Sequence, residues 1–222
     1  MKTKEIISIL LTVTAFAVYI ITFGQYGKKV LFILLFLTVI FAYIAVRFHM
    51  RRIPDSAPKT VRRFIWFCFL LFIHLLLSFT LTSSYFYRPS SFAFTDPEGF
   101  NVYLQNRVNL IPFYTIREIS DKSSFYTVII NNIGNIVALM PMGVFLPLLF
   151  FRQRRIKMFI MTTTFAVILI ESTQMLFLMG AWDIDDLILN VTGAVIMFLI
   201  MRSRLAKKMF EMLFPGVPYE VR

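Results

Sequence analysis

The stretch FIWFCFLLFIHLLLSFTLT, residues 64–82, contains no Asp, Glu, Lys or Arg. A helix of about 20 apolar residues can cross the hydrocarbon core of a bilayer. The whole chain has this character, because 58% of its 222 residues are hydrophobic, only 16% are charged, and the mean hydropathy is +0.74. Soluble domains carry about 25% charged residues. The composition therefore excludes a soluble enzyme, a disordered chain and a secreted disulfide scaffold, and it predicts an integral membrane protein.

Six such apolar segments occur, at residues 6–23, 30–46, 64–82, 128–151, 158–179 and 187–201. They do not alternate between apolar and polar residues as the strands of a membrane barrel do, so we expect helices. The sixth segment is short for a span, and we expect residues 183–186 to form its first turn. The predicted fold class is all-α: one membrane domain, residues 1–222, built as a polytopic bundle of about six transmembrane helices.

Basic residues between these segments set the predicted orientation. If the N-terminus is cytoplasmic, the cytoplasmic segments hold 17 Lys and Arg residues and the outer segments hold 6. Cytoplasmic loops carry an excess of Lys and Arg in membrane proteins, so we expect both termini inside the cell. The net charge of +11 is then explained by anionic lipid headgroups as partners, and nucleic acid is not expected.

The predicted domain has four parts: residues 1–82 with three helices, an extracellular loop at 83–127, a core of three helices at 128–201, and a basic tail at 202–222. The loop is rich in aromatic residues that favour a membrane interface, including Tyr85, Phe86, Tyr87 and Phe92. The tail has apolar residues at helical spacing beside basic ones. This pattern indicates an interfacial amphipathic helix or a frayed continuation of the sixth helix.

Polar residues concentrate in the core of three helices, where they are expensive and mark candidate sites. Helical spacing places Asn132 with Asn135, and Glu171 with Gln174, each pair on one helix face. In the predicted orientation all three helices bring their polar groups to the outer half of the bilayer. We therefore expect one polar pocket, open to the extracellular face. Its predicted ligand-binding residues are Asn132, Asn135, Glu171, Gln174, Asp183, Asp186 and Asn190.

These residues also have structural interpretations. Asp183 could cap the sixth helix, with Asp186 favoured by the helix dipole, and the asparagines could bond between helices. Glu171 is harder to explain in this way, because so deep a carboxyl group must be protonated, paired or bound to a metal. The oxygen-rich set would suit a divalent cation such as Mg²⁺ or Ca²⁺, although the cofactor is left open.

Small residues have a simpler interpretation. Gly134, Gly143 and Gly193 lie in the fourth and sixth segments, and we expect them to allow close approach between helices. The single cysteine, Cys68, can form no intrachain disulfide, and we interpret it as an apolar filler.

Three motifs in the second half of the chain resemble the VanZ-like family of bacterial membrane proteins. They are NLIPF at residues 109–113, NNIGNIVALMPMGVFLP at 131–147 and ESTQMLFLMGAWDIDDLILNVTGA at 171–194. One departure is Ala181-Trp182, where many members carry a basic residue. The family's founding member is associated with resistance to the glycopeptide antibiotic teicoplanin. The resemblance implies a multi-pass protein of the bacterial plasma membrane that acts at the cell envelope, with the seven polar residues at the family's polar positions.

The sequence leaves three functions open. In the first, which we predict, the protein contacts membrane lipids, and its outward pocket engages a lipid-linked envelope precursor or a lipoglycopeptide. This function would link the protein to teicoplanin resistance. In the second, the protein is a membrane enzyme acting on a lipid-linked substrate through Glu171, Asp183 and Asp186, with Glu171 as general acid or base. In the third, Glu171 is the protonation switch of a proton-coupled transporter.

Overall fold

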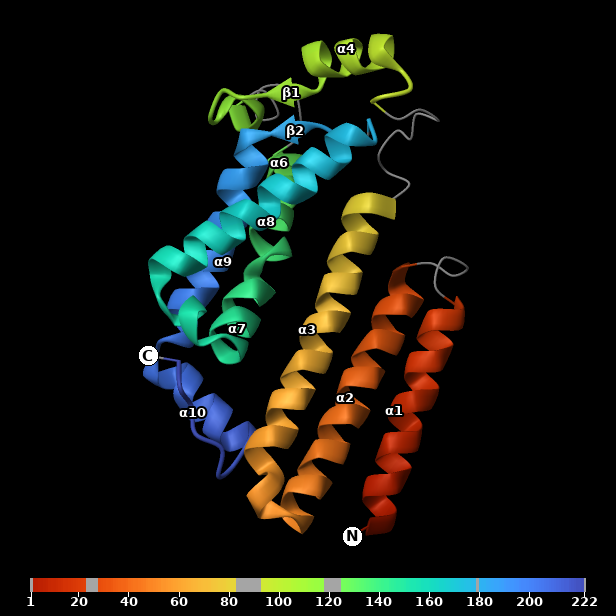
Figure 1. Cartoon of the computed structure of the whole chain (residues 1–222), viewed down its shortest axis with the longest axis vertical. Helices are drawn as coiled ribbons and strands as arrows, with labels where there is room; N and C mark the ends of the chain where they lie inside the picture. Colours follow the sequence, from red (N-terminus) through yellow and green to blue (C-terminus); the bar gives the residue numbers. More distant parts are fainter. Residues whose placement is uncertain (1, 23–27, 83–92, 118–124, 179, 222) are drawn as a thin grey trace. The chain divides into compact units, whose positions relative to one another are not determined.

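The computed structural model describes residues 2–22, 28–82, 93–117, 125–178 and 180–221 (Figure 1). Its α-helices are α1 (Lys2–Thr22), α2 (Lys28–Arg52), α3 (Ala57–Thr82), α4 (Pro97–Asn106), α6 (Phe125–Ala138), α7 (Met140–Leu149), α8 (Ile156–Leu176), α9 (Ile184–Met201) and α10 (Arg204–Leu213). The structure also has two short strands, β1 (Val108–Asn109) and β2 (Trp182–Asp183). In this described part six helical segments are long and apolar enough to cross a membrane. The all-α, six-span fold is thus confirmed, while the orientation stays a prediction.

The chain divides into two compact units. One comprises Met1–Leu70 with Arg204–Glu220, and the other comprises Leu71–Ser203 with Val221–Arg222. The end of α3 therefore belongs to the same unit as the core of three helices. The aromatic residues Tyr85, Phe86, Tyr87 and Phe92 of the predicted extracellular loop lie outside the described residues.

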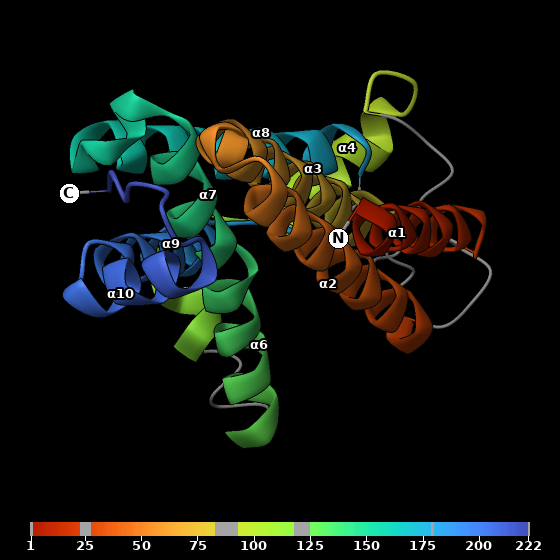
Figure 2. The ribbon, with the colours of Figure 1, turned by 90° about the horizontal axis from the view of Figure 1, so that it is seen from below.

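In the first unit α1 and α2 lie side by side (Figures 1 and 2). The carboxylate of Glu5, only 4% exposed, joins them by accepting from Arg52 Nε at 2.8 Å and contacting His49 Nδ1 at 2.7 Å. Arg47 donates to the carbonyl oxygen of Leu213 at 2.7 Å, which attaches the end of α10 to α2. Buried charges require such partners, so Glu5 fixes the register of the two helices.

The basic tail forms a helix of its own, α10, instead of continuing α9. Ala206 and Phe210 are its buried residues, whereas Leu205, Met209 and Met212 are at least half exposed. The apolar stripe predicted from the sequence is therefore present on a separate helix. Its position at a membrane interface stays a prediction.

In the second unit the fourth segment is broken. We expected one helix over residues 128–151, but α6 ends at Ala138 and α7 begins at Met140, with Leu139 between them. Pro141, in the first turn of α7, explains the break, because proline lacks an N–H and restricts the residue before it. Sequence alone does not fix the break, since prolines are also tolerated within membrane helices.

Two of the three glycines allow close packing around α9. A Cβ on Gly193 would lie 1.8 Å from the carbonyl oxygen of Ile136 in α6, and one on Gly143 would lie 2.6 Å from that of Ala194. The close approach predicted for Gly143 and Gly193 is therefore confirmed. It is wrong for Gly134, where the described residues place no atom within 4 Å of the same position apart from its chain neighbours and the nearby backbone of α6 itself.

A two-residue parallel bridge joins distant parts of the second unit. Val108 pairs with Trp182, and Asn109 pairs with Asp183. The bridge places the NLIPF motif directly beside the start of α9 (Figure 1). It thereby brings a loop residue, Asn109, within reach of the acidic turn.

Candidate functional site

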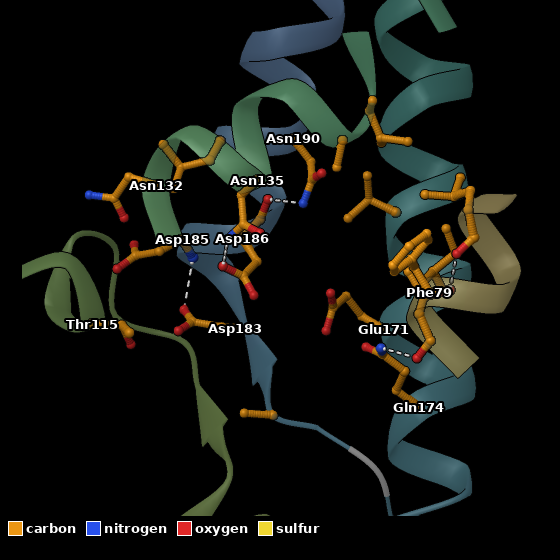
Figure 3. Close-up of a pocket in the computed structure, with 18 of the residues that line it drawn as sticks. Phe79, Thr115, Asn132, Asn135, Glu171, Gln174, Asp183, Asp185, Asp186 and Asn190 are labelled. Atoms are coloured by element: carbon orange, nitrogen blue, oxygen red, sulfur yellow. Dashed lines mark hydrogen bonds between the residues drawn. The ribbon is translucent and has the colours of Figure 1, made fainter. Parts of the chain in front are cut away.

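A cavity of about 420 Å³ lies inside the second unit. Its lining comes from α3, the segment after β1, α6, α8, β2 and α9 (Figure 3). All seven polar residues predicted from the sequence line it: Asn132, Asn135, Glu171, Gln174, Asp183, Asp186 and Asn190. The structure therefore brings together groups that are up to 58 residues apart along the chain, from Asn132 to Asn190.

Asp183 caps α9. Its Oδ1 accepts a hydrogen bond from the Asp185 backbone N–H at 2.9 Å and another from Asn109 Nδ2, also at 2.9 Å. The capping role considered for Asp183 is thus confirmed, and one of its oxygens is fully used within the protein. A carboxylate at a helix N-terminus is also favoured by the helix dipole.

Asp185, which the sequence did not single out, holds the loop after β1. It is 1% exposed, and its two carboxylate oxygens accept from the backbone N–H groups of Phe113 and, at 3.1 Å, Ile116. Phe113 has a φ of 65°, which is unusual for a bulky side chain. The only signals in the sequence for this role of Asp185 were its position among three nearby aspartates and the unexplained NLIPF motif.

Asp186 connects α9 to α6. Its carboxylate accepts from Asn135 Nδ2, and its backbone carbonyl accepts from Asn190 Nδ2 at 2.8 Å. Asn135 is therefore an interhelical bridge, whereas the described bond of Asn190 stays within α9. The amide of Asn132 points away from Glu171 (Figure 3), so these predicted residues do not all converge on one point.

Glu171 is the least satisfied member of the set. It is 7% exposed, and its Oε2 is buried without a hydrogen-bond partner among the residues that the structure describes. Its carboxyl group points toward the side of the cavity where Asp186 lies (Figure 3), and the negative charges of Asp186 and Asp183 both act on it. Gln174, one turn further along α8, donates to the Thr80 carbonyl oxygen of α3 at 2.8 Å. Glu171 thus has an oxygen available for a ligand.

The part of the cavity lining that the structure describes supplies no positive charge. Among the lining residues described there is no Lys or Arg. Burial raises the pKa of Tyr103 to about 12, and the charge of Glu171 acts in the same direction, so this phenol stays neutral. In the described chain, no three His, Cys, Asp or Glu side chains are grouped so that they could hold a metal. The possible Mg²⁺ or Ca²⁺ site therefore has no geometric support in these residues.

Comparison with known protein families gives a match over most of the chain. The family model described as VanZ/LLP1 matches residues 64–207. This range contains every residue that lines the cavity. No curated protein and no solved structure matches the chain.

Proposed function

Because the chain belongs to the VanZ/LLP1 family, we propose that it acts at the bacterial cell envelope, as a multi-pass protein of the plasma membrane, and lowers susceptibility to teicoplanin. The antibiotic is suggested by the family resemblance of the three motifs. We further propose that the cavity engages a lipid-linked envelope precursor or the lipoglycopeptide itself, from the extracellular side.

The observation that carries this proposal is the unpartnered carboxylate oxygen of Glu171 in the cavity. A buried acceptor left without a partner costs about 1–3 kcal/mol, and more when it is charged. Such groups are rare in folded proteins and call for an explanation, of which a ligand is one. The cavity volume of about 420 Å³ also falls within the range of roughly 300–1,000 Å³ typical of ligand sites.

A lipid-linked ligand is supported by the loop beside the cavity. Leu110, Ile111 and Phe113 are each more than half exposed, while Thr115 and Ile116 of the same segment line the cavity. An amphiphile needs a polar site for its headgroup and an apolar surface for its chain. The segment 110–116 offers both within a few residues.

The two other functions have weaker support. For an enzyme, Glu171, Asp183 and Asp186 would be the reacting groups, but the described side chains contain no metal-binding group of three, and Asp183 Oδ1 is already used twice. For a proton-coupled transporter, the break at Leu139 is one discontinuous span, whereas such folds typically pair two broken helices. Binding without chemistry or transport is therefore the function that we propose.

The proposal is tested in a teicoplanin-susceptible host. Cells expressing the wild-type chain are expected to show a several-fold higher minimal inhibitory concentration of teicoplanin than cells with an empty vector. Glu171→Gln is expected to abolish the increase, whereas Glu211→Gln, at an exposed position of α10 outside the cavity, is expected to retain it. Equal membrane levels are checked by immunoblot. An unchanged teicoplanin susceptibility with wild-type protein present would refute the resistance function, and full resistance with Glu171→Gln would refute the role of the cavity.

A further inference from the structure

Three amide side chains of the cavity each use one N–H within the protein. Asn135 donates to Asp186, Asn190 donates to the Asp186 carbonyl, and Gln174 donates to Thr80. An amide nitrogen carries two N–H groups and the amide oxygen can only accept, so each of these side chains keeps one donor and its acceptor oxygen. The carboxylates of the lining, which only accept when ionised, therefore give the cavity its excess of acceptor oxygens.

The charged residues described in the lining of the cavity are all acidic. Glu171, Asp183 and Asp186 are carboxylates, and the described lining holds no Lys or Arg to offset them. Taking an unpaired charge out of water costs several kcal/mol, and this cost is recovered only with a well-placed partner. An acceptor-rich, acidic cavity with a buried unpartnered carboxylate oxygen favours a ligand that brings both donors and positive charge.

We propose that the cavity binds the primary ammonium group of an amphiphile, with Glu171 as its main acceptor. An ammonium group has three donors and no acceptor, so it complements both the acceptor excess and the charge. A phosphate or carboxylate would be repelled, and a trimethylammonium group would bring charge without any N–H donor. This inference rests on the proposed function, because it specifies the headgroup chemistry of the ligand.

Glu171 is the best-placed of the three carboxylates. Asp183 already accepts two hydrogen bonds on one oxygen, and Asp186 is held by Asn135. Only Glu171 combines near-complete burial with an oxygen that has no partner among the described residues. Its direction toward Asp186 (Figure 3) would let one ammonium group contact acceptors of α8 and α9 together.

The test measures ligand-induced stabilisation of the purified full-length chain in a neutral maltoside detergent. Three probes share the same chain: dodecylamine, dodecyltrimethylammonium and dodecyl phosphate. A fourth, butylamine, carries the ammonium group without the long chain. A ligand that binds only the folded state stabilises it by RT ln(1 + L/Kd), where L is the ligand concentration, so the melting temperature rises with ligand concentration. We expect a dose-dependent rise with dodecylamine and none with the trimethylammonium or phosphate probes.

The Glu171→Gln variant should weaken the apparent affinity for dodecylamine by about tenfold or more, the loss typical of a charged hydrogen bond. Glu211→Gln serves as the matched control and should bind like the wild type. The comparison of melting temperatures among the four probes uses the wild-type protein alone. The proposal therefore remains testable if Glu171→Gln fails to fold. Equal stabilisation by dodecylamine and dodecyltrimethylammonium would overturn the ammonium proposal. The absence of stabilisation by both dodecylamine and butylamine would also overturn it.

The amine arms distinguish the sources of the ligand. Stronger binding of dodecylamine than of butylamine supports a lipid headgroup, whereas equal binding supports an amine of a soluble molecule. The outcomes also separate this inference from the proposed function. Teicoplanin resistance that depends on Glu171 without ammonium binding overturns only the ammonium inference, and selective ammonium binding without any change in susceptibility overturns only the resistance function.

Discussion

Gly193 in α9 has no room for a side chain, and Gly193→Ala therefore tests the packing that encloses the cavity. The added Cβ would lie 1.8 Å from the carbonyl oxygen of Ile136 and 2.6 Å from its carbonyl carbon. Both atoms belong to the backbone of α6, so no side-chain rotation relieves the overlap. Restoring an ordinary contact of 3.4 Å requires the two helices to separate by about 1.6 Å.

That separation has a calculable cost. Overpacking of this kind costs about 1–3 kcal/mol. The hydrogen bond from Asn135 to Asp186 spans the same two helices, and loss of a bond to a charged group costs about 1.5–3 kcal/mol. The two costs together are about 2.5–6 kcal/mol, which corresponds to a fall in melting temperature of roughly 5–24 °C for a chain of this size.

The assay is thermal unfolding of the purified protein in detergent, followed by circular dichroism and by the monodisperse fraction on size exclusion. Gly134→Ala is the matched control, because no described atom beyond its chain neighbours and the nearby backbone of α6 lies within 4 Å of the added Cβ, and alanine is favoured over glycine in a helix by about 1 kcal/mol. Its melting temperature is expected to equal or exceed that of the wild type. If Gly193→Ala melts no lower than Gly134→Ala, the close approach of α6 and α9 is not what stabilises this unit.

Two further substitutions test other buried carboxylates. Asp185→Asn leaves one acceptor oxygen for the two loop N–H groups that Asp185 holds. The free energy of unfolding should therefore fall by about 1.5–3 kcal/mol, and limited proteolysis at residues 110–116 should accelerate. An unchanged cleavage rate would argue against this role of Asp185. Glu5→Gln should lower stability by roughly 1–2 kcal/mol because the buried pair with Arg52 loses its charge. Glu211→Gln, whose pair with Lys207 is exposed, should change the melting temperature little, and an equal loss from both substitutions would contradict the importance of burial.

Patterns within single segments predicted much of this protein. Apolar runs predicted the six spans, and the cost of polar groups in a bilayer identified seven of the residues that line the cavity. Small residues within apolar segments also correctly indicated close packing at Gly143 and Gly193, although not at Gly134. These features depend on one helix at a time, and their physical cause is visible in the local sequence.

Features that depend on how segments meet were not predictable in the same way. The bridge between Asn109 and Asp183 has only two residues on each side, too few to show an alternating pattern. Asp183, Asp185 and Asp186 look equivalent in sequence, and only the position of the loop makes Asp185 its anchor. The contact of Gln174 with Thr80 likewise depends on the register of α8 against α3.

The bridge between β1 and β2 has a consequence for biosynthesis. Asn109 is synthesised 74 residues before its partner Asp183, and translation at about 5–20 residues per second makes this interval roughly 4–15 s. Throughout that time the nascent loop lacks the carboxylates that later anchor it. The acidic turn is thus delivered after the loop that it anchors, and a ribosome stalled before it would leave an insertion intermediate whose loop N–H groups lack the Asp185 acceptor.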